Sequence, residues 1–155
     1  MSEANRTRVI DAVTEVVRDL ELDGIKGVYN RNRDKQGATE QFPCVEIRRD
    51  DSADRESRLT AEHDVVGYGV RIAFKFRDVA GPKSPAGRSD AWHEALCHAF
   101  RNRNSNTAGG GKLPDMPEVR EITIEPMPIG SIGRDTAMMV EGGLIVRVFV
   151  VEQRG

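Results

Sequence analysis

The chain has 155 residues and a mass of 17.2 kDa, the size of one ordinary domain with its own hydrophobic core. Its 38% of hydrophobic residues and 15 glycines are typical of a globular protein, and its formal net charge of −2 excludes an overall positive field that would hold nucleic acid nonspecifically. The first residues lack the apolar stretch of a signal peptide, and no apolar run is long enough to span a bilayer, so we expect neither a secreted nor a membrane protein.

Two segments have the 3.6-residue periodicity of amphipathic helices. The first covers residues 5–22, and Gly24 is its expected end. Its apolar face consists of Val9, Val13, Val16, Val17 and Leu20. The second begins at the cap Ser89-Asp90 and runs to about Arg103. Its apolar face consists of Trp92, Ala95, Leu96, Ala99 and Phe100.

Strand patterns fill most of the remaining sequence. The clearest is residues 66–76, in which six apolar side chains occupy every second position and predict a sheet with one buried face. Further strands are predicted at 27–29, 44–48, 118–125 and 136–152, with Pro126 and Pro128 ending the fourth of these five strands. The polar residues 49–60 are predicted to be an exposed connection. The order α-β-β-β-α-β-β predicts one domain, residues 1–155, of the α+β class, with a mainly antiparallel sheet packed by two helices.

The last predicted strand is apolar on both faces. Leu144, Val146, Val148 and Val150 occupy one face, while Ile145, Phe149 and Val151 occupy the other. Two explanations remain open for the second face: one of the protein's own helices covers it, or a neighbouring subunit does. Ile145, Phe149 and Val151 are therefore candidate subunit-interface residues.

Three predicted loops, residues 30–41, 78–88 and 102–117, carry or adjoin small groups of basic side chains. The candidate docking residues are Arg31, Arg33, Arg101, Arg103 and Lys112. Such residues can contact a partner or a phosphate backbone, but the same composition is typical of an ordinary solvated surface. Residues 102–117, which contain three consecutive glycines, are expected to be the most mobile of the three loops.

Motifs for catalysis or metal binding are incomplete. In His93-Glu94-Ala95-Leu96-Cys97-His98, the position four residues after the first histidine holds Cys97, so the two imidazoles do not share a helix face as a zinc protease requires. Glu46 with Asp50 and Asp51 faintly suggests a two-metal nuclease, although arginines interleave with these acids as on a solvated surface. We expect Cys44 and Cys97 to be reduced thiols. No catalytic residue, cofactor or metal ligand is predicted.

The order of these elements resembles that of tail terminator proteins of long-tailed bacteriophages, which are tail-completion or head–tail joining proteins. The resemblance rests on an amphipathic first helix, a Phe-Pro entry to a strand, a long alternating strand, a helix that carries a tryptophan, and two closing strands with an apolar end. These segments are residues 9–20, 42–47, 66–76, 92–100 and 144–151.

The resemblance implies a structural virion protein of the tail–neck region, assembled in the host cytoplasm. Such proteins form a homohexameric ring on the last ring of the tail tube protein, stop tube growth and present a surface to the head-side connector or stopper protein. DNA passes through the lumen without being read, and neither a cofactor nor a membrane takes part. Another head–tail joining component, or a small metal-dependent nuclease, is the alternative.

Overall fold

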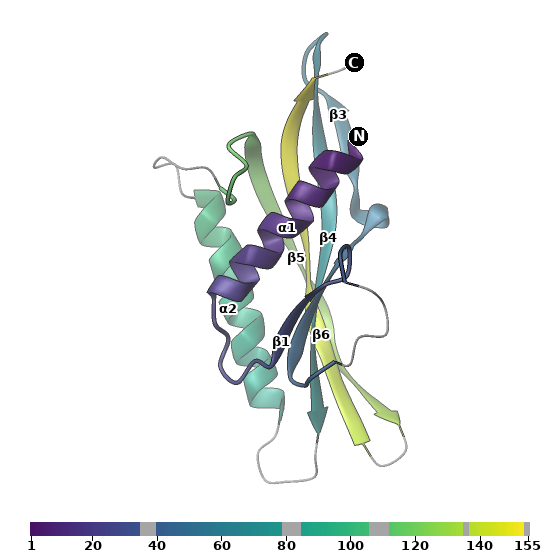
Figure 1. Cartoon of the computed structure of the whole chain (residues 1–155), viewed down its shortest axis with the longest axis vertical. Helices are drawn as coiled ribbons and strands as arrows, with labels where there is room; N and C mark the ends of the chain where they lie inside the picture. The colour runs from purple at the N-terminus through teal and green to yellow at the C-terminus, as the bar shows by residue number, and fades with distance from the viewer. Residues whose placement is uncertain (35–39, 79–84, 106–111, 135–136, 154–155) are drawn as a thin grey trace.

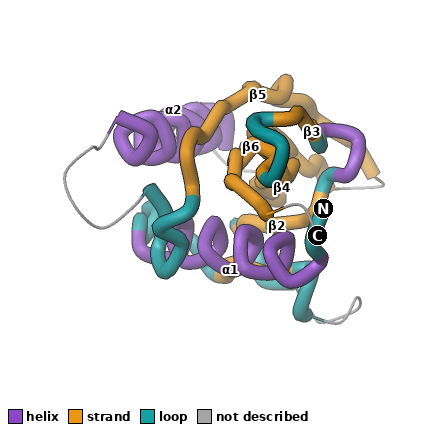
Figure 2. The backbone as a smooth tube through the Cα atoms, turned by 90° about the horizontal axis from the view of Figure 1, so that it is seen from above, coloured by secondary structure: helices purple, strands orange, loops and turns teal. Residues whose placement is uncertain are grey.

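The computed structural model describes residues 1–34, 40–78, 85–105, 112–134 and 137–153. These form a mixed β-sheet with two long helices on one of its faces, as Figures 1 and 2 show. The helices are α1 (Glu3–Asp19) and α2 (Pro85–Ser105), and the short 3-10 helix is η1 (Asp51–Ala53). The strands are β1 (Gly27–Asn30), β2 (Cys44–Arg49), β3 (Arg55–Arg58), β4 (His63–Asp78), β5 (Val119–Arg134) and β6 (Ala137–Gln153).

The sheet is mainly antiparallel. Its strand order is β1-β2-β4-β6-β5. Strand β3 pairs with residues 64–67 of β4, along the same edge of β4 that pairs with β2 at residues 70–75. Only β1 and β2 run parallel among the described strands. The predicted α+β class with two helices and a mainly antiparallel sheet is therefore confirmed.

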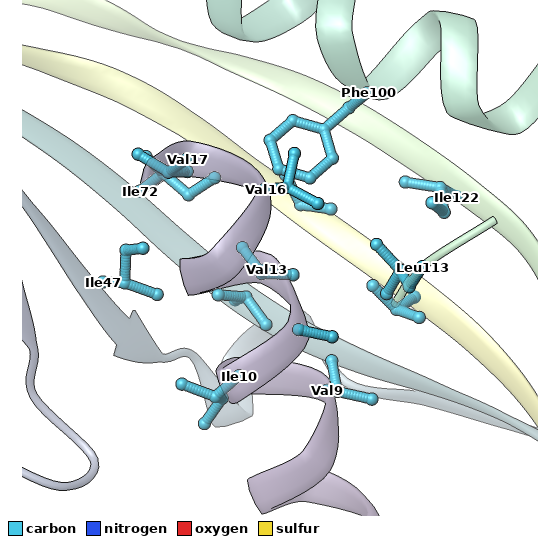
Figure 3. Packing of buried hydrophobic residues seen from close by; sticks show 14 of the residues in the cluster. Val9, Ile10, Val13, Val16, Val17, Ile47, Ile72, Phe100, Leu113 and Ile122 are labelled. Atoms are coloured by element: carbon cyan, nitrogen blue, oxygen red, sulfur yellow. The ribbon is translucent and has the colours of Figure 1, made fainter. Parts of the chain in front are cut away.

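Hydrophobic side chains from both helices and from one sheet face form the core, which Figure 3 shows from close by. The six alternating residues of β4 are all nearly inaccessible to solvent, as the period of two predicts. The buried residues of this strand are Val66, Tyr68, Val70, Ile72, Phe74 and Phe76. The predicted helix faces also point inward, with Val13 of α1 and Phe100 of α2 fully buried.

Helix α1 begins and ends earlier than its hydrophobic pattern predicts. Ser2 is the N-cap, and its side chain accepts a hydrogen bond from the backbone N–H of Asn5. The helix ends at Asp19, and Glu21 then adopts a positive φ of 47°. The chain therefore leaves the helix before Gly24, which lies in the following turn with φ 75°.

Three local predictions are wrong. Helix α2 starts at Pro85 instead of Ser89, because proline is well tolerated in the first turn of a helix, where its missing N–H costs no bond. Strand β5 continues through Pro126 and Pro128, since an edge strand has one side on which no ladder bond is needed. The polar connection 49–60 contains η1 and β3, whose four exposed residues show no apolar alternation.

The predicted loops lie partly outside the described residues. Residues 35–39, 79–84 and 106–111 belong to them, so the mobility expected for 102–117 is not addressed by the structure. Within the described part of that last loop, Leu113 and Met116 are buried in the core. Cys44 and Cys97 are both buried free thiols, as predicted. Neither of the described helices is both long and apolar enough to cross a membrane.

Candidate subunit interface on the outer sheet face

The sheet face turned away from α1 and α2, here called the outer face, carries the predicted interface residues. Leu144, Val146, Val148 and Val150 of β6 point into the core beneath the helices. Because side chains alternate along a strand, Ile145, Phe149 and Val151 lie on the outer face. Both helices pack against the other face, so the explanation that a helix covers these three residues is wrong.

The apolar part of the outer face is a strip along β6 and the start of β4. Ile145, Phe149 and Val151 are half-buried, and so is Val65, the direct partner of Val151 across the two strands. We call these four residues the apolar strip. Val65, Phe149 and Val151 are neighbours on the sheet surface, and Arg147 lies between Phe149 and Ile145 on the same face. None of the four residues of the strip is part of the core cluster beneath the helices.

The ring of Phe149 packs against Gly67, its partner in β4. A Cβ atom added to Gly67 would lie 2.7 Å from the Phe149 ring, so the ring occupies the space that any larger residue would need. Packing of an aromatic ring over a strand glycine restores the contacts that the glycine lacks. The glycine thus leaves the space in which the Phe149 ring packs against the sheet.

Helix η1 covers the next part of the outer face, above Gly69. A Cβ at Gly69 would lie 2.4 Å from the Asp50 carbonyl oxygen and 2.6 Å from the Ala53 Cβ, so only glycine allows this approach. The backbone N–H of Asp50 donates to the Gly69 carbonyl oxygen at 2.9 Å. Nε of Arg147 on β6 donates to the carbonyl oxygen of Ala53 at 2.8 Å, which ties η1 to a second strand.

A buried ion pair connects η1 to α1. The Arg6 side chain is 5% exposed and donates two hydrogen bonds, at 2.8 and 3.1 Å, to the Asp54 carboxylate. That carboxylate also accepts from the backbone N–H of Gly69 at 2.8 Å. The hydrogen bond and the negative charge of Asp54 raise the pKa of the Arg6 guanidinium, although burial opposes the change. Asp54, at the end of η1, therefore connects this helix to both α1 and β4.

A second buried ion-pair cluster lies on the outer face of β2. The Glu46 side chain is 2% exposed, and its carboxylate lies 3.1 Å from Lys75 Nζ and 3.2 Å from Arg31 Nε. Arg48 donates to the same carboxylate through Nε. Burial acts to raise the pKa of Glu46, but hydrogen bonds from Arg48 and Lys75 outweigh it and hold the pKa well below its usual value.

Cys44 lies next to this cluster, and its thiol is unreactive. It pairs with Lys75 across the sheet and is fully buried. Burial raises the pKa of its thiol to about 11, so the thiol stays protonated near neutral pH. Such a group packs as a small hydrophobic residue and is a poor nucleophile.

The candidate docking residues lie in different environments. The side chain of Arg31 is only 6% exposed and pairs with Glu46 and Glu40, so it points toward the sheet instead of outward from a loop. Arg33 is exposed but pairs with Asp11 of α1. Arg101 is exposed, whereas Arg103 and Lys112 are half-buried. The contacts of the described residues do not connect these five basic side chains into one surface patch.

The acids that suggested a nuclease are used in ion pairs within the chain. Glu46 pairs with Lys75 and its neighbouring arginines, and Asp51 pairs with Arg49 at 2.9 Å. Asp50 lies 3.9 Å from Arg71. Within the described ranges, no three histidine, cysteine or acidic side chains come together as a metal site requires.

Two features of the outer face are not predicted from the sequence: the packing of η1 against Gly69, and the buried position of the Arg31 side chain. The alternation of β4 placed Gly67 and Gly69 on the outer face, and two glycines among larger residues are a signal of close approach that can be read from the sequence. No comparable signal marks Arg31. Comparison of the chain with protein-family models and with curated proteins found no match.

Proposed function

We propose that this chain is a structural assembly protein of the bacteriophage neck, a tail terminator. Copies of it form a ring, expected to be a hexamer, on the last ring of the tail tube protein. The ring stops tube growth and offers its other side to the head-side connector, while DNA passes through the lumen. The protein acts in the virion through its surfaces, without a cofactor.

The observation that supports this function best is the apolar strip on a rigid sheet face that neither helix covers. Its centre, Phe149, packs against Gly67, and η1 beside it is held by hydrogen bonds from Arg147 to Ala53 and from Gly69 to Asp54. An apolar patch on a surface that is already ordered is typical of protein–protein contacts, because little entropy is lost when a partner covers it. A ring protein needs such a surface between its copies.

The pairing of the charged groups is consistent with this function. Glu46, Asp51 and Asp54 each contact a basic side chain of their own chain, which is the arrangement of structural ion pairs. A hydrolytic metal site would need such carboxylates to converge on a cation instead. The proposed function requires only folded surfaces, which these ion pairs stabilise.

The direct test combines purified protein with purified tail tubes and tube protein that is still able to polymerise. Electron microscopy should show rings of the free protein, and rings at one end of tubes that have stopped growing. The variant Phe149→Asp places a charge in the centre of the apolar strip and should abolish both rings and arrest of growth.

A matched control variant is Ala91→Asp, which adds the same charge at an exposed position of α2. It should form rings and arrest tubes as the wild type does. Tubes that grow equally long with and without the wild-type protein would refute the proposed function. So would arrest by Phe149→Asp at the wild-type concentration.

A further inference from the structure

Cys44 is buried on the side of the sheet that the helices do not cover. It alternates along β2 with Val45 and Ile47, which point into the core, so its side chain lies on the outer face. The residue is nevertheless fully buried, and it is not part of the core cluster beneath the helices. Other residues on the outer face must therefore exclude solvent from this thiol.

Residues 40–42, which lead into β2, form part of this cover, and we call them the latch. Glu40 lies near the Cys44 thiol, because its negative charge adds to the effect of burial in raising the pKa of that thiol. The Tyr29 ring lies beside the same thiol. It occupies the space above Gly27, the residue of β1 that pairs with Cys44, where an added Cβ would be 2.7 Å from two ring-end atoms.

Polar contacts hold the first two residues of the latch in place. The Glu40 carboxylate pairs with the Arg31 guanidinium and lies 3.6 Å from Lys75 Nζ. The backbone N–H of Gln41 donates a hydrogen bond to the Tyr29 hydroxyl at 2.9 Å. The Glu40 side chain is 22% exposed, so water and salt reach its ion pairs.

The third residue of the latch, Phe42, adds no contact with the hydrophobic core. Its ring is half-buried, lies outside the core cluster, and has the Arg77 guanidinium 4.9 Å from its centroid. Partly exposed ion pairs contribute little to stability, and a segment that has few buried apolar contacts opens at a low cost in free energy. The latch is thus a weakly held cover over a rigid sheet.

A buried donor next to the latch favours its opening. The Arg31 side chain is 6% exposed, yet its Nη1 has no hydrogen-bond partner among the described residues. A buried donor without a partner costs free energy, which is recovered when water reaches it. The backbone N–H of Arg31 donates to the Ile47 carbonyl oxygen at 2.8 Å, so Arg31 itself remains attached to the sheet when Glu40 moves away.

From these contacts we infer that the latch opens and closes while the sheet beneath it stays folded. In the closed form the latch shields the Cys44 thiol from solvent. In the open form the thiol meets solvent, and Lys75 keeps its contact with Glu46, 3.1 Å away. A partner that contacts the latch binds the two forms with different affinities and so shifts the equilibrium between them. The latch opens within a single chain, so its opening does not depend on the proposed ring.

The reactivity of the Cys44 thiol measures the opening. The wild-type chain is treated with iodoacetamide at neutral pH, and mass spectrometry of its peptides gives the labelling rate of Cys44 separately from that of Cys97. Opening of the latch exposes little surface, so the Cys44 rate should be nearly independent of urea below the unfolding transition. A rate that rises with urea as steeply as global unfolding would show that only the unfolded chain exposes this thiol, and would overturn the inference.

Two substitutions that remove contacts of the latch should accelerate the labelling. Glu40→Gln removes the charge that faces Arg31 and Lys75, and Tyr29→Phe removes the acceptor of the Gln41 N–H. We expect each variant to label its Cys44 thiol about two- to fivefold faster than the wild type, the effect of losing a weak polar contact. Because Tyr29→Phe keeps the charge of Glu40, a faster rate in this variant cannot come from a changed acidity of the thiol.

The matched control is Glu94→Gln, which makes the same change at an exposed position of α2 and should label its Cys44 thiol at the wild-type rate. The thermal unfolding temperature shows that each variant is folded. Raising the salt from about 0.05 to about 0.5 M should accelerate labelling of the wild type, because salt screens the partly exposed ion pairs of Glu40. Wild-type labelling rates in both folded latch variants, Glu40→Gln and Tyr29→Phe, would overturn the inference.

Discussion

The two faces of the sheet share the same three long strands, but their side chains are organised on different principles. On the inner face every second residue of β4 from Val66 to Phe76 is buried beneath the helices. On the outer face the same strand presents Gly67, Gly69, Arg71 and Lys75, and its contacts are a ring over a glycine, a 3-10 helix over another, and ion pairs. Hydrophobic packing determines the inner face, and close backbone approach with charge pairing determines the outer one.

This difference has a consequence for function. The inner face is completed within one chain, since both helices cover it and its residues are nearly inaccessible. The outer face keeps an apolar strip of half-buried side chains that neither helix covers. The following substitutions test whether the two faces differ as described, from the largest expected effect on stability to the smallest.

The largest effect is expected for Ile72→Ala on the inner face. The side chain is fully buried, so its truncation removes transfer free energy and leaves a cavity, at a cost of about 2–5 kcal/mol. Its neighbour Arg71 points to the outer face, and Arg71→Ala should change stability by less than about 0.5 kcal/mol in the single chain. Chemical denaturation measures both. Equal costs for the two would contradict the assignment of the faces.

The next effect is expected for Glu46→Gln in the outer-face ion-pair cluster. The amide keeps the shape of the side chain but loses the charge that faces Lys75 and Arg31, so we expect a loss of about 1.5–3 kcal/mol, the range of hydrogen bonds to charged groups. The exposed Glu94→Gln on α2 is the matched control and should be neutral. If Glu46→Gln had the same denaturation midpoint as the wild type, the ion-pair cluster would not contribute to the stability of the fold.

Acid titration tests the same cluster. The pKa of Glu46 is lowered in the folded state, so its stabilisation is complete above its ordinary value near 4.5 and is lost as the pH falls toward about 2. The stability difference between the wild type and Glu46→Gln should therefore shrink over this interval. Unfolding measured at several values between pH 7 and pH 2 reads this trend, and a constant difference would contradict it.

A smaller effect is expected where η1 approaches the sheet. Gly69→Ala forces a methyl group against the Asp50 carbonyl and Ala53, and we expect a cost of about 1–3 kcal/mol for this overpacking. Gly67→Ala meets only the Phe149 ring, which can turn outward, so its cost should be lower. Thermal unfolding of the pair ranks them. A larger loss of thermal stability for Gly67→Ala than for Gly69→Ala would mean that η1 moves away from the added methyl group more easily than the Phe149 ring does.

Much of the fold could be predicted from the sequence because its signals are apolar periodicities. The alternation from Val66 to Phe76 and the helical arcs of Val13 and Phe100 all point to the core that the structure contains. Strand β3 could not be predicted in this way, since it is a fully exposed edge strand whose pairing partner, not its hydrophobicity, makes it a strand. The prediction that Pro126 ends its strand is wrong for a similar reason, because a proline interrupts a central strand but is tolerated in an edge strand such as β5.

For the candidate site, the sequence predicted the residues but not their surroundings. The two apolar faces of residues 144–151 identified Ile145, Phe149 and Val151 as the second face, and the structure places them on the sheet surface away from the helices. Arg31 was expected in an outward-pointing loop because local composition does not show that Glu46 lies within reach. The pairing of distant charges follows from strand register, which only the folded chain defines.

The mass of the purified protein in solution tests the central claim, that the outer face is completed by further copies of the chain. Light scattering at concentrations up to about the millimolar range should give a ring of several chains for the wild type and 17.2 kDa for Phe149→Asp, with both folded. A wild-type protein that remains at 17.2 kDa throughout would contradict the account.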